Sequence, residues 1–160
     1  MTTSLYDKDF VAWTAQQASL LKDRKFDQVD WDEVIEEIED MGNRHHDKLY
    51  SHTVILLQHL LKWQFQPERQ GNSWRSTIVN NRAEIPRLLK RYPSLKTDWD
   101  NQEWYAEVWH DAIRRATNET GLKNAFPQSP IWTSEQILDD DFFPSVEQKL
   151  SIGDEPEIDR

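Results

Sequence analysis

Four carboxylates close together in the sequence are the first candidates for chemistry: Glu36, Glu37, Glu39 and Asp40. Glu36 and Asp40 are four residues apart, so a helix would place both side chains on one face. Carboxylate oxygens gathered on one face are ligands for a divalent cation. The competing interpretation, which we favour, is a solvated or salt-bridged surface opposite Ile35 and Ile38.

Histidines recur every seven residues, at His45, His52 and His59. Residues seven apart in a helix are separated by ~10.5 Å along its axis, whereas zinc holds each imidazole nitrogen at about 2.0–2.1 Å. None of the three belongs to a His-Glu-x-x-His or Glu-x-x-His pair. We favour histidines that are hydrogen-bonded to carboxylates at the edge of a core. The alternative is that His59 faces Glu36 or Asp40 across a helical hairpin, and these three are the candidate metal ligands.

A third group combines basic, aromatic and amide side chains on either side of a predicted turn. Arginine and tryptophan together can hold a phosphate or stack on a base. The interpretation that we favour is structural: Arg69 or Arg75 pairs with Glu68 or Glu37, and Trp63 packs on Trp74. Taken with the acidic run, the candidate polar site consists of Glu36, Glu37, Asp40, His59, Lys62, Gln66, Arg69, Trp74, Arg75 and Arg82.

Several kinds of chemistry lack their usual sequence signatures. The chain has no cysteine, which excludes disulfides, cysteine-ligated metals and a thiol nucleophile. It also has no phosphate-binding glycine loop, no nucleophile elbow and no dinucleotide fingerprint. We therefore assign no catalytic residue, expect no cofactor, and lean towards a protein that is not an enzyme.

Charge is distributed unevenly along the 160 residues, whose net charge is −10. Residues 41–98 carry 10 basic and 4 acidic side chains, and the segments on both sides of them are acidic. A basic middle can indicate an anionic partner, but we favour neutralisation of basic helices by acidic ones, because the negative overall field repels nucleic acid. We expect another protein, or a second copy of the chain, as the partner. We expect no membrane association and a cytoplasmic location, because the sequence has no signal peptide and no long apolar stretch.

Helical periodicity predicts an all-α fold: a single bundle of about five helices followed by a loop-rich C-terminal strap. The expected helices cover residues 7–24, 30–41, 43–66, 74–92 and 96–119. Asp30 and Glu33 resemble a capping box, Gly121 is the expected C-cap and Thr133 the expected start of a short helix. Gly42 either ends a helix or lies inside a longer one, and Pro86 should kink or restart its helix. We expect one domain over residues 5–144 and an acidic, mobile tail over residues 145–160.

Longer motifs resemble a known bacterial family. The similarity is carried by Leu5-Tyr6-Asp7, Ile35-Glu36-Glu37-Ile38-Glu39-Asp40-Met41-Gly42, His59-Leu60-Leu61-Lys62-Trp63-Gln64-Phe65-Gln66-Pro67-Glu68 and Asp141-Phe142-Phe143-Pro144. These blocks resemble the domain of unknown function 29, which is found mainly in cyanobacteria. The resemblance implies an all-helical fold and a bacterial cytoplasm, and it implies no activity.

Three functions remain, in order of preference. The first is a non-catalytic protein-interaction or regulatory domain. The second is a metal-dependent hydrolase or nuclease that uses Glu36, Glu37, Asp40 and His59. The third is a single-stranded nucleic-acid binder that uses Arg69, Trp74, Arg75 and Arg82.

Overall fold

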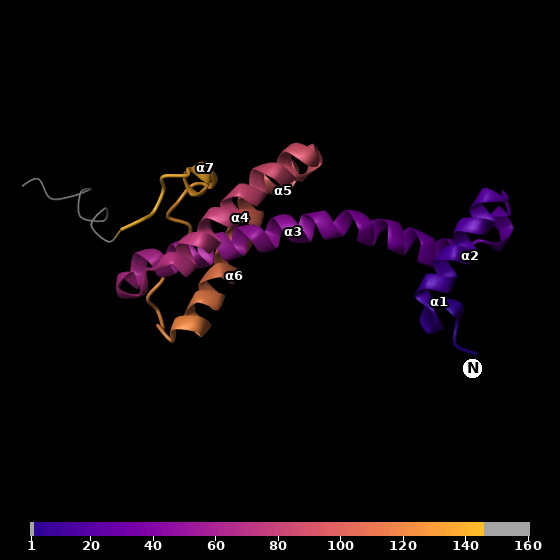
Figure 1. The fold of residues 1–160 in the computed structure, drawn as a ribbon, viewed down its shortest axis with the longest axis horizontal. Coiled ribbons are helices and arrows are strands. Elements are labelled where there is room, and N and C mark those ends of the chain that lie inside the picture. The colour runs from indigo at the N-terminus through magenta and orange to yellow at the C-terminus, as the bar shows by residue number, and fades with distance from the viewer. Residues whose placement is uncertain (1, 146–160) are drawn as a thin grey trace, which may run out of the picture. The chain divides into compact units, whose positions relative to one another are not determined.

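The chain is all-α in the computed structural model, which describes residues 2–145, and no strand occurs among them (Figure 1). Its elements are α1 (Leu5–Lys8), α2 (Phe10–Lys22), α3 (Trp31–Phe65), α4 (Asn72–Arg91), α5 (Lys96–Trp99), α6 (Gln102–Thr120) and α7 (Ser134–Leu138), with three short 3-10 turns. The chain divides into two compact units, residues 1–44 and 45–160. The expected single domain over residues 5–144 stays a prediction. All of the predicted tail except Ser145 lies outside the described residues.

The first unit begins with two short helices where the sequence predicted one. Ser4 caps α1, and its hydroxyl accepts from the backbone N–H of Asp7. At Asp9 the backbone leaves the helical region, with φ −151° and ψ 88°. The Asp9 carboxylate then accepts from the N–H of Ala12 at 3.0 Å and begins α2. An N-cap in the middle of the apolar pattern therefore separates the two helices.

Helix α3 is continuous from Trp31 to Phe65, so two expected helices are one. Gly42 lies inside it, and a β-carbon at that position would meet no atom within 4 Å. A glycine inside a helix costs about 1 kcal/mol relative to alanine, which is too little to interrupt a helix of this length. Only the second half of α3 contains buried residues, from Leu49 onwards.

The expected capping box at Asp30 and Glu33 is replaced by longer-range contacts. The Asp30 carboxylate accepts from the Trp13 indole N–H at 2.9 Å and from the Gln17 amide at 3.2 Å. Gln17 in turn accepts from the Asp30 backbone N–H at 2.8 Å. Trp13 and Gln17 are the buried residues of α2. Within the first unit, Asp30 thus ties α2 to the start of α3.

The second unit surrounds the last turns of α3 with α4 and α6 (Figure 1). Its core contains fully buried leucines of α3 together with Ile78 and Ile85 of α4 and Trp109 of α6. Helix α4 continues through Pro86 and ends at Arg91. Of the two predicted alternatives at Pro86, the restart is therefore excluded, and the kink stays a prediction. Proline removes one backbone donor, and the packing of Ile85 and Leu89 on both sides of it holds the helix in place.

The C-terminal strap, residues 121–145, lies against this core. Gly121 adopts φ +72° and caps α6, which confirms the prediction, because that backbone region favours glycine. Thr133 is the N-cap of α7 and forms a complete capping box with Gln136, which confirms the predicted start of this short helix. Phe126, Trp132 and Ile137 anchor the strap and are each less than a tenth exposed. No helix in the described part of the chain has the length and hydrophobicity needed to cross a membrane.

Candidate functional site

Lys62 is the most deeply buried charge among the predicted site residues. Its side chain is 1% exposed, and its Nζ donates to Glu119 Oε1 at 2.8 Å. The same ammonium lies 4.6 Å from the centre of the Trp74 ring, a cation–π distance. The amide of Gln58 donates to the other Glu119 oxygen at 2.6 Å. Lys62 and Trp74 are therefore brought together as predicted, around a carboxylate that the sequence did not single out.

The environment of this pair changes the acidity of its neighbours. Burial raises the pKa of the Glu119 carboxyl, but the hydrogen bond and charge of Lys62 outweigh it and the net pKa is lowered. Burial lowers the pKa of the His59 imidazole. His59 Nδ1 donates to the backbone carbonyl of Ile55 at 2.8 Å. A neutral His59 therefore lies beside the Lys62–Glu119 pair. Each charge of the pair has a partner, which is typical of a structural role.

Arg82 is bound to the strap. It is 2% exposed, and its guanidinium donates to three backbone carbonyls: Ile137 at 2.8 Å, Asp140 at 3.3 Å and Phe142 at 2.7 Å. These bonds use three of the five N–H donors of the guanidinium. Arg82 thus joins α4 to residues 137–142.

Phe143 makes further contacts between α4 and the strap, and we call Arg82 with its strap partners the clamp. Its ring lies 4.6 Å from the Arg75 guanidinium and 5.3 Å from that of Arg82. The Trp63 ring packs on it with 5.1 Å between ring centres. The expected Trp63–Trp74 packing and the expected pairing of Arg75 with a glutamate are therefore both replaced by contacts with the strap. Both arginines contact the ring of Phe143, a strap residue far along the chain, and local spacing in the sequence does not reveal this partner.

Two remaining residues of the predicted corner lie at the turn between α3 and α4. Gln66 is 8% exposed and precedes the 3-10 turn Pro67–Arg69. Arg69 is exposed at the end of that turn. Lys62, Trp74, Arg75 and Arg82 thus all have partners within the chain, although Arg75, like Arg69, is exposed.

The three histidines spaced seven residues apart, His45, His52 and His59, do not pair with carboxylates, contrary to expectation. His52 Nδ1 donates to Asn81 Oδ1 at 2.8 Å, and His59 donates to a backbone carbonyl. His45 stacks on Tyr92 with 4.1 Å between ring centres, and its Nδ1 is buried without a hydrogen-bond partner in the described structure. The histidine that does pair with a carboxylate is His46, through Asp98.

The acidic run lies at the start of α3, in the first unit. Glu36 and Asp40 are exposed, and Glu37 is half-buried. Glu37 accepts a hydrogen bond from the Tyr6 hydroxyl, and this bond raises the Tyr6 pKa to about 12. His59 follows on the same continuous helix, so the hairpin that would have turned it back towards Glu36 is not formed. Within residues 2–145, no three histidine or carboxylate side chains gather closely enough to hold a metal ion.

Comparison with known proteins gives one match. A family model described as "Domain of unknown function DUF29" matches residues 5–143. The chain belongs to the DUF29 family. No curated protein and no solved structure matches it. The family match confirms the resemblance that the sequence motifs carry and assigns no activity.

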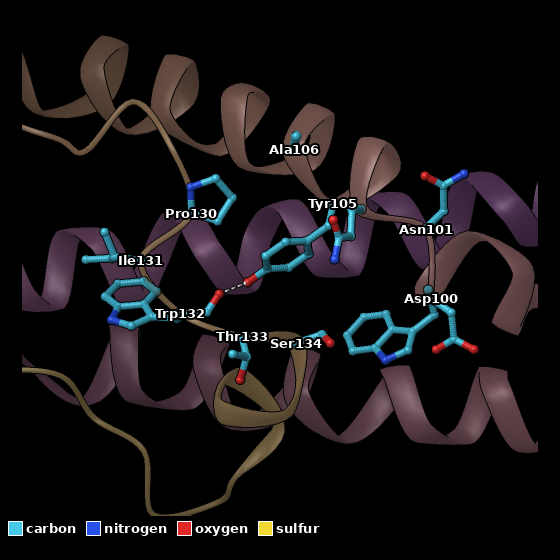
Figure 2. A pocket seen from close by; sticks show the side chains of 11 residues that line it. Asp100, Asn101, Tyr105, Ala106, Pro130, Ile131, Trp132, Thr133 and Ser134 are labelled. Carbon is cyan, nitrogen blue, oxygen red and sulfur yellow. Dashed lines mark hydrogen bonds between the residues drawn. The ribbon is translucent and has the colours of Figure 1, made fainter.

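Two features of this DUF29 chain were missed by reasoning about charged residues. One is an apolar stripe at the start of α3, consisting of Trp31, Ile35, Ile38 and Met41, which is exposed although its spacing is typical of a core-facing helix. The other is a cavity between α6 and the strap, lined in part by Trp99, Tyr105 and Trp132 (Figure 2). Its residues come from segments about 30 positions apart in the sequence, so no local pattern reveals it.

Proposed function

We propose that this DUF29 chain is a non-catalytic interaction domain whose apolar stripe binds a basic amphipathic helix of another protein. The stripe is Trp31, Ile35, Ile38 and Met41 on α3. The observation that supports this most is its exposure: 46%, 50%, 61% and 59% of these side chains is open to solvent. Exposed apolar residues that lie together are a recognised mark of protein-binding surfaces.

The helical spacing makes the stripe continuous. Trp31, Ile35 and Ile38 follow at intervals of four and three residues, so their side chains lie one above another on one face. Helices α1 and α2 contact other positions of α3, through Tyr6 with Glu37 and Trp13 with Asp30. Within the first unit, Ile35, Ile38 and Met41 are thus at least half exposed. Trp31 packs on Phe26 and donates its indole N–H to the Phe26 carbonyl at 2.9 Å.

Charge selects the kind of partner. Residues 1–44 carry 11 acidic and 5 basic side chains. Asp32 and Glu39 are exposed and follow the stripe residues along the same helix turns. A second copy of the chain would bring like charges together, whereas a helix with lysine or arginine beside its apolar face would be attracted. The chemistry thus favours a basic amphipathic helix over self-association.

The test uses the full chain and two fluorescent 18-residue peptides, one built from leucine and lysine and the other from leucine and glutamate. Fluorescence anisotropy should show that the leucine–lysine peptide binds at least 10-fold more tightly, and that salt weakens its binding. The double variant Ile35→Ser/Ile38→Ser should reduce its affinity at least 10-fold. The matched control is Val79→Ser, which changes a 49% exposed side chain on α4.

Three outcomes would contradict the proposal. They are equal binding of both peptides, equal loss of affinity in the Val79→Ser control, and a dimer in sedimentation velocity that the double variant abolishes. The last outcome would assign the stripe to a second copy of the chain. Circular dichroism of each variant shows whether the helices remain intact.

We also propose a cytoplasmic location. The absence of cysteine supports it, because proteins of reducing compartments rarely contain disulfides. The metal-dependent hydrolase and the nucleic-acid binder stay predictions, and no described contact favours either of them.

A further inference from the structure

The second unit contains a cavity of about 610 Å³ between the start of α6 and the strap. Figure 2 shows Tyr105 and Ala106 on α6 facing the strap segment Pro130–Ser134. A volume of this size lies within the range of about 300–1,000 Å³ that small-molecule sites occupy. All of its lining residues belong to one unit, and it shares none with the apolar stripe.

Three aromatic side chains line the cavity: Trp99, Tyr105 and Trp132. Their ring contacts are made with other residues, Trp99 with Trp104, and Trp132 with Trp109 and Phe142. The Tyr105 hydroxyl donates to the Trp132 carbonyl at 2.8 Å, which fixes the phenol and holds the strap on α6. Trp132 is 7% exposed, so Trp99 and Tyr105, which are half-buried, offer the larger accessible aromatic surface.

The charge at the cavity is negative. Asp100 is the charged residue among those that line it, and no hydrogen bond or ion pair engages its carboxylate in the described structure. The start of α6 is an opposing positive feature, but a helix N-terminus carries only about half a unit charge. Asn101 already accepts from the N–H groups of Glu103 and Trp104, at 2.8 and 3.2 Å. The full charge of Asp100 outweighs what remains, so the cavity favours a cation.

The polar groups also limit the type of cation. A primary ammonium is strongly hydrated and needs several acceptors in place of its water. The cavity supplies one carboxylate, the hydroxyl of Ser134 and the amide of Gln102, whereas the side-chain oxygens of Asn101 and Thr133 already accept from helix N–H groups. Its other lining residues are the three aromatic residues, Ala106, Pro130 and Ile131. Aromatic faces attract alkylated ammonium groups, which carry a positive charge and little hydration. We infer that this cavity binds a small organic cation with an alkylated ammonium group.

The experiment compares choline with 3,3-dimethylbutan-1-ol, its uncharged analogue of nearly the same shape, on the full chain. Chemical-shift changes of the tryptophan indole N–H groups in NMR titrations report binding. Choline should saturate the shifts at millimolar concentration, and the neutral analogue should bind at least 10-fold more weakly. Acetate, the anionic probe, should leave the shifts unchanged.

Two variants locate the site. Asp100→Asn should weaken choline binding about 5-fold, because one partly exposed charge pair contributes about 1 kcal/mol. Glu103→Gln is the matched control: it removes a carboxylate three residues along the chain, in the first turn of α6, that does not line the cavity, and it should change the affinity less than 2-fold. Both changes are conservative in shape, and circular dichroism verifies that the fold is kept.

Any of three results would overturn the inference. The first is no choline binding at 50 mM, and the second is equal binding of the neutral analogue, which would make the cavity a purely apolar site. The third is an equal effect of Asp100→Asn and Glu103→Gln, which would mean that only the general negative field attracts the cation. None of these results bears on the peptide-binding proposal, because the stripe lies in the other unit.

Discussion

Residues 45–145 bury most of their large apolar side chains, and residues 2–44 leave most of theirs exposed. In the second unit, Leu56, Leu57, Leu60 and Leu61 of α3 have no exposed surface. In the first unit, Trp13 and Val29 are the buried apolar residues, while Phe10, Val11 and the stripe of α3 are open to solvent. One continuous helix contributes to both units, so the difference does not arise from helix formation.

The difference arises from what is available to cover the helix. In the second unit, α4 and α6 have 20 and 19 residues and pack on α3 together with the strap. In the first unit, α1 and α2 have only 4 and 13 residues. Because apolar area removed from water stabilises by about 25 cal/mol per Å², we expect the first unit to open at a lower free energy than the second. An amphipathic helix therefore forms a core only where partner helices are long enough to cover it.

The largest expected effect comes from removing a core side chain of the second unit. Leu60→Ala should lower the free energy of unfolding by about 3 kcal/mol, because it leaves a cavity at a fully buried position. Ile38→Ala, at a 61% exposed position of the stripe, should change it by less than about 0.5 kcal/mol. Urea unfolding followed by tryptophan fluorescence measures both. Equal losses would show that the stripe is covered in solution.

The clamp at Arg82 should give the next largest effect. Arg82→Met keeps much of the side-chain volume but removes three hydrogen bonds to the strap, so we expect a loss of about 2–3 kcal/mol. Hydrogen exchange should show residues 137–142 losing protection first. Arg87→Met is the control, because Arg87 is 74% exposed and pairs only with Glu84. If both variants behave alike, the clamp contributes nothing to strap stability.

Lowering the pH should reduce the free energy of unfolding of the second unit in two steps, each smaller than the effects of the substitutions above. Burial lowers the pKa of His59 in the folded protein below its ordinary value of 6.5. The unfolded chain therefore binds a proton first, and stability that is present above pH 6.5 is lost as the pH falls towards the folded pKa. The pKa of the Glu119 carboxyl is also lowered, so its contribution is present above pH 4.5 and is lost as the pH falls further.

The measurement is the urea midpoint of unfolding between pH 8 and pH 4. His59→Gln, which cannot gain a proton, should flatten the profile between pH 7 and pH 5.5 and leave the step at lower pH in place. A profile that the substitution leaves unchanged would exclude His59 as the cause of the first step.

Each unit contains one tyrosine–carboxylate hydrogen bond, and these two bonds give the smallest effect. Hydrogen bonding to Glu37 is the main reason that the Tyr6 pKa is raised to about 12. Burial is the main reason that the Tyr50 pKa is raised to about 12, with the bond to Asp111 second. Glu37→Gln should therefore lower the Tyr6 pKa towards its ordinary value, whereas Asp111→Asn should leave the Tyr50 pKa clearly raised.

Titration of the tyrosine ring resonances by NMR distinguishes the two hydroxyls. A return of Tyr50 to its ordinary pKa in Asp111→Asn would mean that its burial is less complete than the structure shows, and would reduce the contrast between the units.

Features that depend on a few neighbouring residues were predictable. The all-helical fold, the αL cap at Gly121 and the start of α7 at Thr133 follow from side chains within four positions of the backbone groups that they serve. The family membership also followed from short motifs, and the family model confirms it over residues 5–143. The continuity of α3 through Gly42 was one of two alternatives that the sequence left open.

Other features were decided by contacts between distant residues. Asp30 has the sequence of a capping residue, yet Trp13 and Gln17 bind its carboxylate. Arg82 has the charge of a phosphate ligand, yet strap carbonyls 55 to 60 residues later bind its guanidinium.

The sequence by itself determined that the chain is helical, that α6 ends at Gly121 and α7 begins at Thr133, and which family the chain belongs to, because hydrogen bonding and capping within a helix are local. It did not determine the other helix boundaries: residues 7–24 and 96–119 each form two helices, and residues 30–66 form one. Only the tertiary structure decided that the stripe of α3 is exposed while the later leucines of the same helix are buried. Burial depends on which other segments lie against a face, and both faces show the same periodicity in the sequence.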